Sequence, residues 1–246
     1  MRRRLLGPAQ WLGLLLLLSA ASGCGIIDYY FLPPPEDTAQ ELYESGVTAM
    51  QEKDYDDAVE YFTKLKDRFP FSPYAPRAEI GLGDAYYMDE RYPEAVEAYK
   101  EFEALHPADE EIPYVLFQIG MSSFRQFKSI DRRQDNIREG LDYFYRLEEN
   151  YPGSKYAGAA KEYIVKSRRV LAEHEVYIAD FFWRSERYGS AWKRYVYVVE
   201  NFPDLPNIQA YAKRRAQNSY YEYQKELSQE EREQIEGSWK EWFEWL

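Results

Sequence analysis

The most constraining feature of this chain is a spacing that recurs four times, in which a small residue is followed twelve positions later by a proline. An aromatic residue also stands four positions after each small one. The four intervals are Ala58–Pro70, Ala95–Pro107, Gly140–Pro152 and Ala191–Pro203. A small residue lets two antiparallel helices approach, the aromatic ring fills the space beside it, and proline cannot continue the second helix. The sequence therefore predicts an all-α solenoid of helical hairpins.

The first helix of each hairpin carries a small residue of its own. In three of the four repeats it stands twelve positions before the small residue of the second helix, at Gly46, Gly83 and Ala179. In the other repeat, twenty positions separate Gly120 from Gly140, which places eight extra residues within 128–136, between the two helices. The pattern resembles the tetratricopeptide repeat (TPR), and it predicts about five repeats, or ten helices.

Helix-type periodicity gives approximate bounds for these helices. The predicted ranges are 37–52, 55–69, 73–89, 93–106, 110–127, 136–151, 155–186, 189–202, 206–226 and 229–245. The range 155–186 exceeds one repeat helix, so we expect an extended rod that reorients the two ends of the solenoid. Ser228 and Glu231 have the spacing of a capping box, which predicts the start of a separate last helix.

That last helix would carry a hydrophobic stripe at helical spacing. Its members are Trp239, Trp242, Phe243 and Leu246. The interpretation that we favour is a stripe packed on the preceding helix. The alternative is a docking surface for a partner, because a terminal repeat normally has a polar outer face.

The N-terminal segment has the arrangement of an export signal. Arginines at 2–4 precede an apolar run over 11–18 and small residues at 20–23, and Cys24, the only cysteine, follows directly. The apolar run is too short for a bilayer-spanning helix, which needs ~20 residues. The arrangement resembles the lipobox of bacterial lipoproteins, which implies that Cys24 is acylated. Gly25, in place of an aspartate, then implies the outer membrane, facing the periplasm. An ordinary signal peptide with an incidental cysteine, or an uncut anchor, is the alternative.

These features divide the chain into four parts. They are a lipoprotein signal peptide at 1–23, a lipidated tether at 24–36, TPR repeats one to three at 37–152, and repeats four and five with the long connecting helix at 153–246. Loss of the signal would remove three arginines and move the formal net charge from -12 to -15. Such an acidic chain argues against nucleic acid as a partner, since nucleic-acid binders carry basic patches.

Enzyme chemistry finds little support in the sequence. The two histidines, His106 and His174, are far apart in the chain, and no His/Asp/Glu group has the spacing of metal ligands. Glycine-rich phosphate loops and nucleophile elbows are absent from the sequence. We therefore expect no catalytic residues, no metal and no cofactor.

Three segments together resemble one family of outer-membrane lipoproteins. They are 68–78 (RFPFSPYAPRA), 150–157 (NYPGSKYA) and 171–179 (LAEHEVYIA). These segments, with the lipobox, the insertion and the long helix, are similar to the BamD (YfiO/ComL) family. The resemblance extends to about Asn207. It implies five helical repeats in the β-barrel assembly (BAM) machinery, without enzymatic activity. It also implies partners: unfolded outer-membrane β-barrel proteins, the POTRA region of BamA, and other Bam lipoproteins.

The repeat register places one set of residues on the concave side of the first two repeats. They are Tyr43, Val47, Met50, Arg77, Ile80, Asp84 and Tyr87. Such a groove could hold an extended segment that ends in an aromatic residue, with Arg77 pairing to its carboxylate. The alternative, of comparable weight, is that several of these side chains complete the packing between repeats.

At the other end of the chain, Arg194 aligns with a position that the family resemblance associates with binding BamA. A guanidinium group suits such an interface because it pairs bidentately with carboxylates. Arg194 could instead pair within its own helix, with Glu186 or Glu200.

Two other classes of function share part of this pattern. A periplasmic TPR scaffold that coordinates the cell wall with the outer membrane would share the repeats and the export signal, but not the 68–78 segment or the long helix. A lipid-anchored hydrolase would need a catalytic group of side chains, such as carboxylates gathered around His174.

Overall fold

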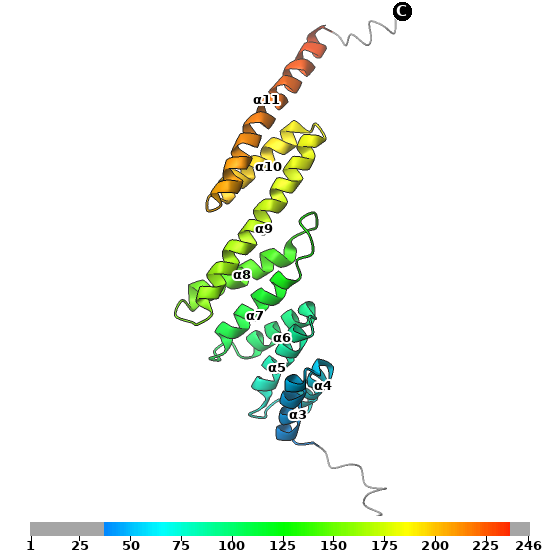
Figure 1. The fold of residues 1–246 in the computed structure, drawn as a ribbon, viewed down its shortest axis with the longest axis vertical. Helices are drawn as coiled ribbons and strands as arrows, with labels where there is room; N and C mark the ends of the chain where they lie inside the picture. Colours follow the sequence, from blue (N-terminus) through cyan, green and yellow to red (C-terminus); the bar gives the residue numbers. More distant parts are fainter. Residues whose placement is uncertain (1–36, 237–246) are drawn as a thin grey trace, which may run out of the picture.

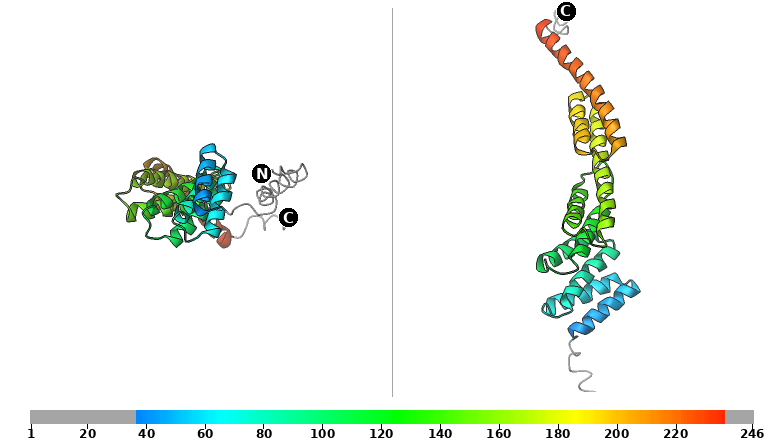
Figure 2. Two further views of the ribbon diagram at one scale, coloured as in Figure 1. Left: turned by 90° about the horizontal axis from the view of Figure 1, so that it is seen from below. Right: turned by 90° about the vertical axis from the view of Figure 1, so that its left-hand side faces the viewer.

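The computed structural model describes residues 37–236, and every regular element within that range is an α-helix. Figure 1 labels nine helices in chain order. They are α3 (Ala39–Glu52), α4 (Tyr55–Arg68), α5 (Ala75–Met88), α6 (Tyr92–Leu105), α7 (Ile112–Arg125), α8 (Asp135–Asn150), α9 (Ala157–Arg184), α10 (Tyr188–Asn201) and α11 (Pro206–Glu236). Each helix packs mainly on its neighbours in the chain, and α3 also touches α5. The helices therefore stack as an elongated solenoid, with α3 and α11 at its opposite ends (Figures 1 and 2).

The hairpins close where the sequence predicts, at small residues facing aromatic rings. The closest pairs are Gly46 with Phe62, Gly83 with Tyr99, and Gly120 with Phe144. In each pair a Cβ atom on the glycine would lie 2.5 Å from the ring, so a larger residue would have to displace it. The three rings are at most 2% exposed. The predicted all-α TPR fold is therefore confirmed, and these contacts explain its spacing.

The recurring prolines also end their helices as predicted. The residue before each proline caps the second helix of a hairpin, and its backbone N–H donates to a carbonyl of the last turn. The four capping residues are Phe69, His106, Tyr151 and Phe202. A residue before proline avoids the α conformation, so the helix stops at this point. Two of the first helices that follow, α5 and α7, then have a proline in their first turn, where no backbone donor is lost.

The long helix α9 joins the two halves of the solenoid. It packs on α8 along its first half and on α10 along its second (Figure 1). From the middle of α9, Arg168 donates to the carboxylate of Asp204 and to the backbone carbonyl of Asn201. These bonds fix the turn between α10 and α11 against the rod. The prediction of one uninterrupted helix over 155–186 is confirmed.

The last predicted boundary is wrong. Helix α11 continues from Pro206 to Glu236, so no separate helix starts at Ser228. The Ser228 hydroxyl donates to the carbonyl of Gln224, four residues earlier, instead of capping a new helix. A serine hydroxyl can cap a helix or donate to the carbonyl four residues earlier within one, and here the helix continues through Ser228. The predicted stripe at 239–246 lies outside the described residues, as do the signal and the tether.

Buried side chains form two hydrophobic clusters that meet at α6. Ala98 belongs to the cluster of α3 to α6, whereas Tyr99 and Phe102 belong to the cluster that continues to α11. One helix thus contributes to both, as expected for repeats that contact only their neighbours. Among the described helices, none is both long enough and apolar enough to cross a bilayer.

Candidate functional site

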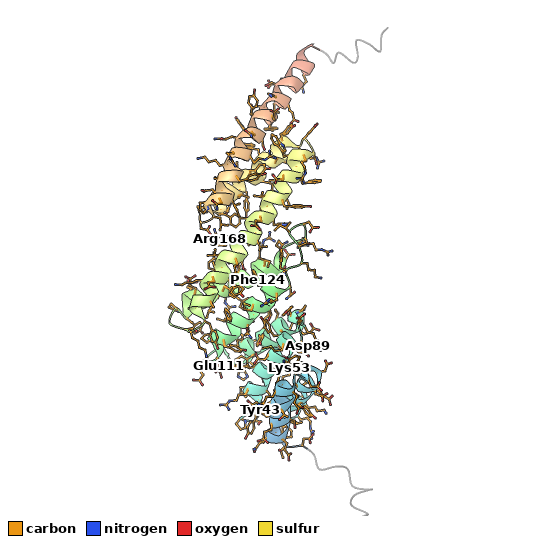
Figure 3. The ribbon with its side chains drawn as sticks, viewed as in Figure 1. Tyr43, Lys53, Asp89, Glu111, Phe124 and Arg168 are labelled. Carbon is orange, nitrogen blue, oxygen red and sulfur yellow. The ribbon has the colours of Figure 1, made fainter. Side chains whose placement is uncertain are left out.

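A groove of about 860 Å³ is lined by residues of the first repeats. Its walls come from α3, α5, the turn before α7 and the turn before α9; Figure 3 labels Tyr43 and Glu111, which line it. Six of the seven residues predicted for a groove line this one. They are Tyr43, Val47, Met50, Arg77, Ile80 and Asp84. The structure thus brings together side chains that the sequence separates by up to 41 positions.

The seventh predicted residue, Tyr87, lies outside this groove. Its ring packs against Tyr92 at 5.5 Å, and its hydroxyl interacts with Arg125, which raises the pKa of that guanidinium. Tyr87 occupies the same register position as Met50, one repeat later. At Tyr87 this position is covered by neighbouring side chains, and the ring packs against the larger of the two hydrophobic clusters. The packing alternative therefore holds for Tyr87.

The groove has an aromatic wall that the register of two repeats could not give. Tyr114 and Tyr156 line it together with Tyr43, and the rings of Tyr114 and Tyr156 lie 5.5 Å apart. Lys155 also lines the groove and lies over the Tyr156 ring, 5.0 Å from its centroid. The signal for Tyr114 was available in the sequence, because it stands 37 residues after Arg77, the distance between Gly83 and Gly120. Tyr156 and Lys155 come from a turn and have no such signal.

The charges in the groove are distributed unevenly. Arg77 and Lys155 supply two cations, and the turn before α7 supplies a row of acidic residues, Asp109, Glu110 and Glu111. Arg77 is exposed on α5. The groove therefore combines an apolar, aromatic wall with the cationic group of Arg77, which is placed to pair with a carboxylate of a bound ligand.

Asp84 lies at the back of the groove and is held by tyrosines. The hydroxyls of Tyr99 and Tyr114 both donate to its Oδ1, and the Tyr99 hydroxyl oxygen lies 2.6 Å from that atom. Gln118 donates to the Tyr114 hydroxyl at 3.0 Å. Burial raises the pKa of Asp84, and these donors oppose only part of that effect. We name Asp84, Tyr99 and Tyr114 the first tyrosine–aspartate network.

A second network of the same kind joins α9, α10 and α11. The hydroxyls of Tyr195 and Tyr211 donate to Asp180, and the Tyr211 hydroxyl oxygen lies 2.9 Å from Oδ1 of that aspartate. Arg215 lies 3.7 Å from the same carboxylate and donates to the Tyr195 hydroxyl at 3.1 Å. We name Asp180, Tyr195 and Tyr211 the second tyrosine–aspartate network.

Arg194 lies close to the second network, on α10. Its Nη1 donates to Glu175 of α9 at 2.5 Å, and the Glu175 side chain is 9% exposed. The alternative of a pair with Glu186 or Glu200 within its own helix is not what the structure shows. The Arg194 side chain is nevertheless 43% exposed, so part of its guanidinium group faces solvent.

The two histidines serve structural contacts. His106 Nε2 lies 2.8 Å from Glu79 Oε2, and His174 Nδ1 lies 2.6 Å from the carbonyl oxygen of Ile130. Within residues 37–236, no three His, Cys, Asp or Glu side chains form a group that could hold a metal ion. The contact of His174 is thus with a backbone carbonyl and not with the carboxylates that a hydrolase would need.

Comparison with known proteins places this geometry in a family. The model of the YfiO family, described as an outer membrane lipoprotein, matches residues 35–235. Outer membrane protein assembly factor BamD of Vibrio cholerae is 28% identical over 205 residues, which are 79% of this chain and 84% of that protein. The factor of the same name from Neisseria meningitidis serogroup A is 26% identical over 204 residues, 79% of this chain and 76% of that protein.

Among solved structures, the first TPR domain of human RPAP3 has a TM-score of 0.43 at 21% identity, covering 56% of this chain and 94% of that domain. The YfiO match, by contrast, covers almost every residue of the chain that the structure describes, including the insertion between α7 and α8 and the rod α9. The chain belongs to the YfiO family of outer membrane lipoproteins.

Proposed function

We propose that the protein is a non-catalytic assembly factor, anchored in the outer membrane by lipid on Cys24, that helps β-barrel proteins fold and insert. Membership of the YfiO family supports this function, as does the name of the relatives, outer membrane protein assembly factor. The observation that carries the proposal is the groove, because an assembly factor must hold unfolded chains without altering them. The signal at 1–23 and the tether at 24–36 complete the proposed arrangement.

The groove suits an extended segment of an unfolded barrel protein. Its wall combines the rings of Tyr43, Tyr114 and Tyr156 with the aliphatic side chains of Val47 and Ile80. Aromatic and aliphatic surface can bind the alternate apolar side chains of an extended strand because their apolar surface is removed from water. This kind of binding does not require one particular amino-acid sequence in the strand. Arg77 is the group that we assign to the carboxylate of the segment. Its guanidinium can hold that carboxylate bidentately.

The surface around Arg194 is the one that we assign to the POTRA region of a BamA-type partner. One side of the guanidinium is occupied by Glu175, which fixes its orientation on α10. A guanidinium carries five donors, so donors remain for a carboxylate of the partner. Arg194 lies on α10, whereas the groove is lined mainly by α3 and α5, near the other end of the solenoid, so the two partners could bind at the same time (Figure 1).

Affinity capture from native membranes tests the proposed function. The full-length protein with a C-terminal tag is solubilised in detergent, captured, and its partners are identified by mass spectrometry. We expect a barrel protein with POTRA domains, other Bam lipoproteins and unfolded barrel precursors. Recovery of cell-wall factors alone would contradict the proposal and support the periplasmic scaffold.

The matched control for this experiment is Cys24→Ser. Without an acylated residue 24, the protein should leave the membrane fraction while its helical circular-dichroism spectrum is unchanged. Two acyl chains anchor a protein stably, at about 0.8 kcal/mol per buried methylene, so the change in partition should be nearly complete. Retention of the Cys24→Ser protein in the membrane with its signal uncleaved would contradict the lipid anchor.

A further inference from the structure

The insertion between α7 and α8 forms a second cleft, of about 490 Å³, against the turn between α5 and α6. Four cations line it. They are Arg125, Lys128, Arg132 and Arg133. All four are exposed, and the acidic residue that lines the cleft is Glu90. Such a group of cations is notable in a chain with a formal net charge of -12.

The insertion is held in place by two buried side chains. The Gln134 side chain is 1% exposed, and its amide donates to the carbonyls of Ser129 and Arg132 at 2.8 and 2.6 Å. His174 of α9, which is 8% exposed, contacts the carbonyl oxygen of Ile130 in the insertion. Connecting loops run over the surface and are generally more mobile than the helices that they join. These anchors preorganise the loop, so its cations are presented in a defined arrangement, which lowers the entropy cost of binding a ligand.

The cations of the cleft are only partly neutralised by the chain itself. Arg133 pairs with Asp135 at 2.8 Å, and Arg132 interacts electrostatically with the neighbouring Asp131. The ion pairs within 4 Å among the described residues include neither Lys128 nor Arg132. The cleft also has aromatic surface, since Tyr92 and Phe127 line it, and Phe127 is 38% exposed. A ligand that fits both features carries several negative charges and at least one apolar side chain.

We infer that this cleft docks an extended acidic segment of a partner protein, a run of Asp and Glu that contains an aromatic residue. Opposite charges favour the encounter and fix its orientation, and the aromatic residue would pack on Phe127 and Tyr92. The cleft shares no lining residue with the groove of the first repeats, so it is a separate site. An anionic bilayer fits less well, because a concave cleft on an acidic chain would bring other carboxylates toward the lipid surface.

Fluorescence anisotropy with the full-length protein in detergent tests this inference. The probe is a labelled peptide of twelve residues, alternating Glu and Asp around one central Phe, and the control probe carries Gln and Asn instead. We expect saturable binding of the acidic peptide, weakened about tenfold by the double variant Lys128→Gln, Arg132→Gln, which corresponds to about 1.4 kcal/mol for the loss of two exposed ion pairs. Binding should also weaken as salt is raised.

The matched control variant is Lys161→Gln with Lys166→Gln, two exposed cations on α9 that lie outside the cleft. It should bind the acidic peptide as the unaltered protein does. Equal losses in both double variants, or equal binding of the acidic and neutral peptides, would overturn the inference.

Two further arms separate the occupants. If Arg77→Glu abolishes binding of the acidic peptide, the peptide occupies the groove and the inference fails. If phosphatidylglycerol vesicles or inorganic polyphosphate bind through Lys128 and Arg132 while the peptide does not, the ligand is a phosphate group and not a protein segment. We expect neither result.

Discussion

The two tyrosine–aspartate networks have the same parts at opposite halves of the solenoid, but they differ in how the carboxylate is compensated. In each, an aspartate on the first helix of a repeat accepts from tyrosines on the next two helices. Gln118 donates to a tyrosine hydroxyl of the first network, and Arg215 does so in the second. The first carboxylate thus has neutral donors alone, whereas the second lies 3.7 Å from a cation.

Adjacent TPR helices can thus be joined through a buried carboxylate that is compensated either by neutral donors or by a cation. Burial raises the pKa of Asp84, because neutral donors do not offset the loss of hydration around its charge. Beside Asp180, Arg215 supplies a full positive charge and also covers the Trp183 ring at 4.4 Å. Asp84 also lines the groove, so the aspartate that joins these helices contributes to the charge of the proposed binding surface.

The largest expected effect concerns the close contact beneath the first network. Gly83→Leu forces a side chain into the Tyr99 ring, which carries the hydroxyl that holds Asp84. Overpacking of this kind costs typically about 1–3 kcal/mol, and here it also displaces a buried hydrogen bond. Thermal and urea unfolding measure the loss.

The matched control is Gly158→Leu on α9, where no atom lies within 4 Å of the added Cβ position. It should leave the free energy of unfolding unchanged or raise it, because leucine favours helix over glycine. Equal melting temperatures for the unaltered protein and Gly83→Leu would show that the repeat register is wrong.

A smaller effect separates the two networks directly. Arg215→Met removes the cation beside Asp180 and should lower the free energy of unfolding by about 2 kcal/mol, since a partly buried carboxylate loses a charged partner. Gln118→Met removes a neutral donor that contacts tyrosine hydroxyls and should cost about 1 kcal/mol or less. Urea unfolding at pH 7 gives both values. If the two substitutions lower the free energy of unfolding equally, the cation beside Asp180 contributes no more stability than the neutral donor of the first network.

The smallest effect is a dependence on pH. Since the pKa of Asp84 is raised by burial, the folded state binds a proton at this carboxyl more tightly than the unfolded state does. The contribution of Asp84 to the free energy of unfolding therefore increases as pH falls through its folded pKa, and levels off below its unfolded pKa of about 3.9. Asp84→Asn should lack this contribution, so its stability relative to the unaltered protein should decline as pH is lowered from 7.

Urea unfolding at several pH values measures this trend, with Asp89→Asn as the control for loss of an exposed carboxylate. A difference between the Asp84→Asn protein and the unaltered one that stays constant with pH would contradict the raised pKa.

The parts of the fold that depend on local spacing could be predicted from the sequence. The contact of Gly83 with Tyr99 and the helix ends before proline follow from residues within one hairpin, so their pattern is visible in the chain. Ser228 shows the limit of such local signals. A serine followed by glutamate three positions later caps a helix or lies within one, and only the continuation of α11 distinguishes the two.

The groove shows a second limit. Met50 and Tyr87 hold the same register position, yet only Met50 lines the groove, because the repeat that follows each of them differs. Tyr156 and Lys155 enter from a turn about 70–80 residues after Arg77. Contacts of that kind depend on the curvature of the whole solenoid, which no spacing within one hairpin specifies.

We propose that the chain binds two partners at separate surfaces, an unfolded barrel segment in the groove and a POTRA region at Arg194. Titration of each variant with both ligands tests it most directly. The first ligand is a peptide copied from the C-terminus of an outer-membrane β-barrel protein, and the second is a purified POTRA region. The variants are Arg77→Glu for the groove and Glu175→Gln with Arg194→Gln for the other surface, because removing both charges avoids leaving Glu175 buried and unpaired.

We expect Arg77→Glu to weaken peptide binding about ten- to a hundredfold and to leave POTRA binding unchanged, since a charge-assisted pair contributes roughly 1.5–3 kcal/mol. The double variant should do the converse, and the charge reversal Lys161→Glu on α9 should affect neither ligand. The claim is contradicted if each variant loses both activities while its helical spectrum is intact, or if neither variant loses any.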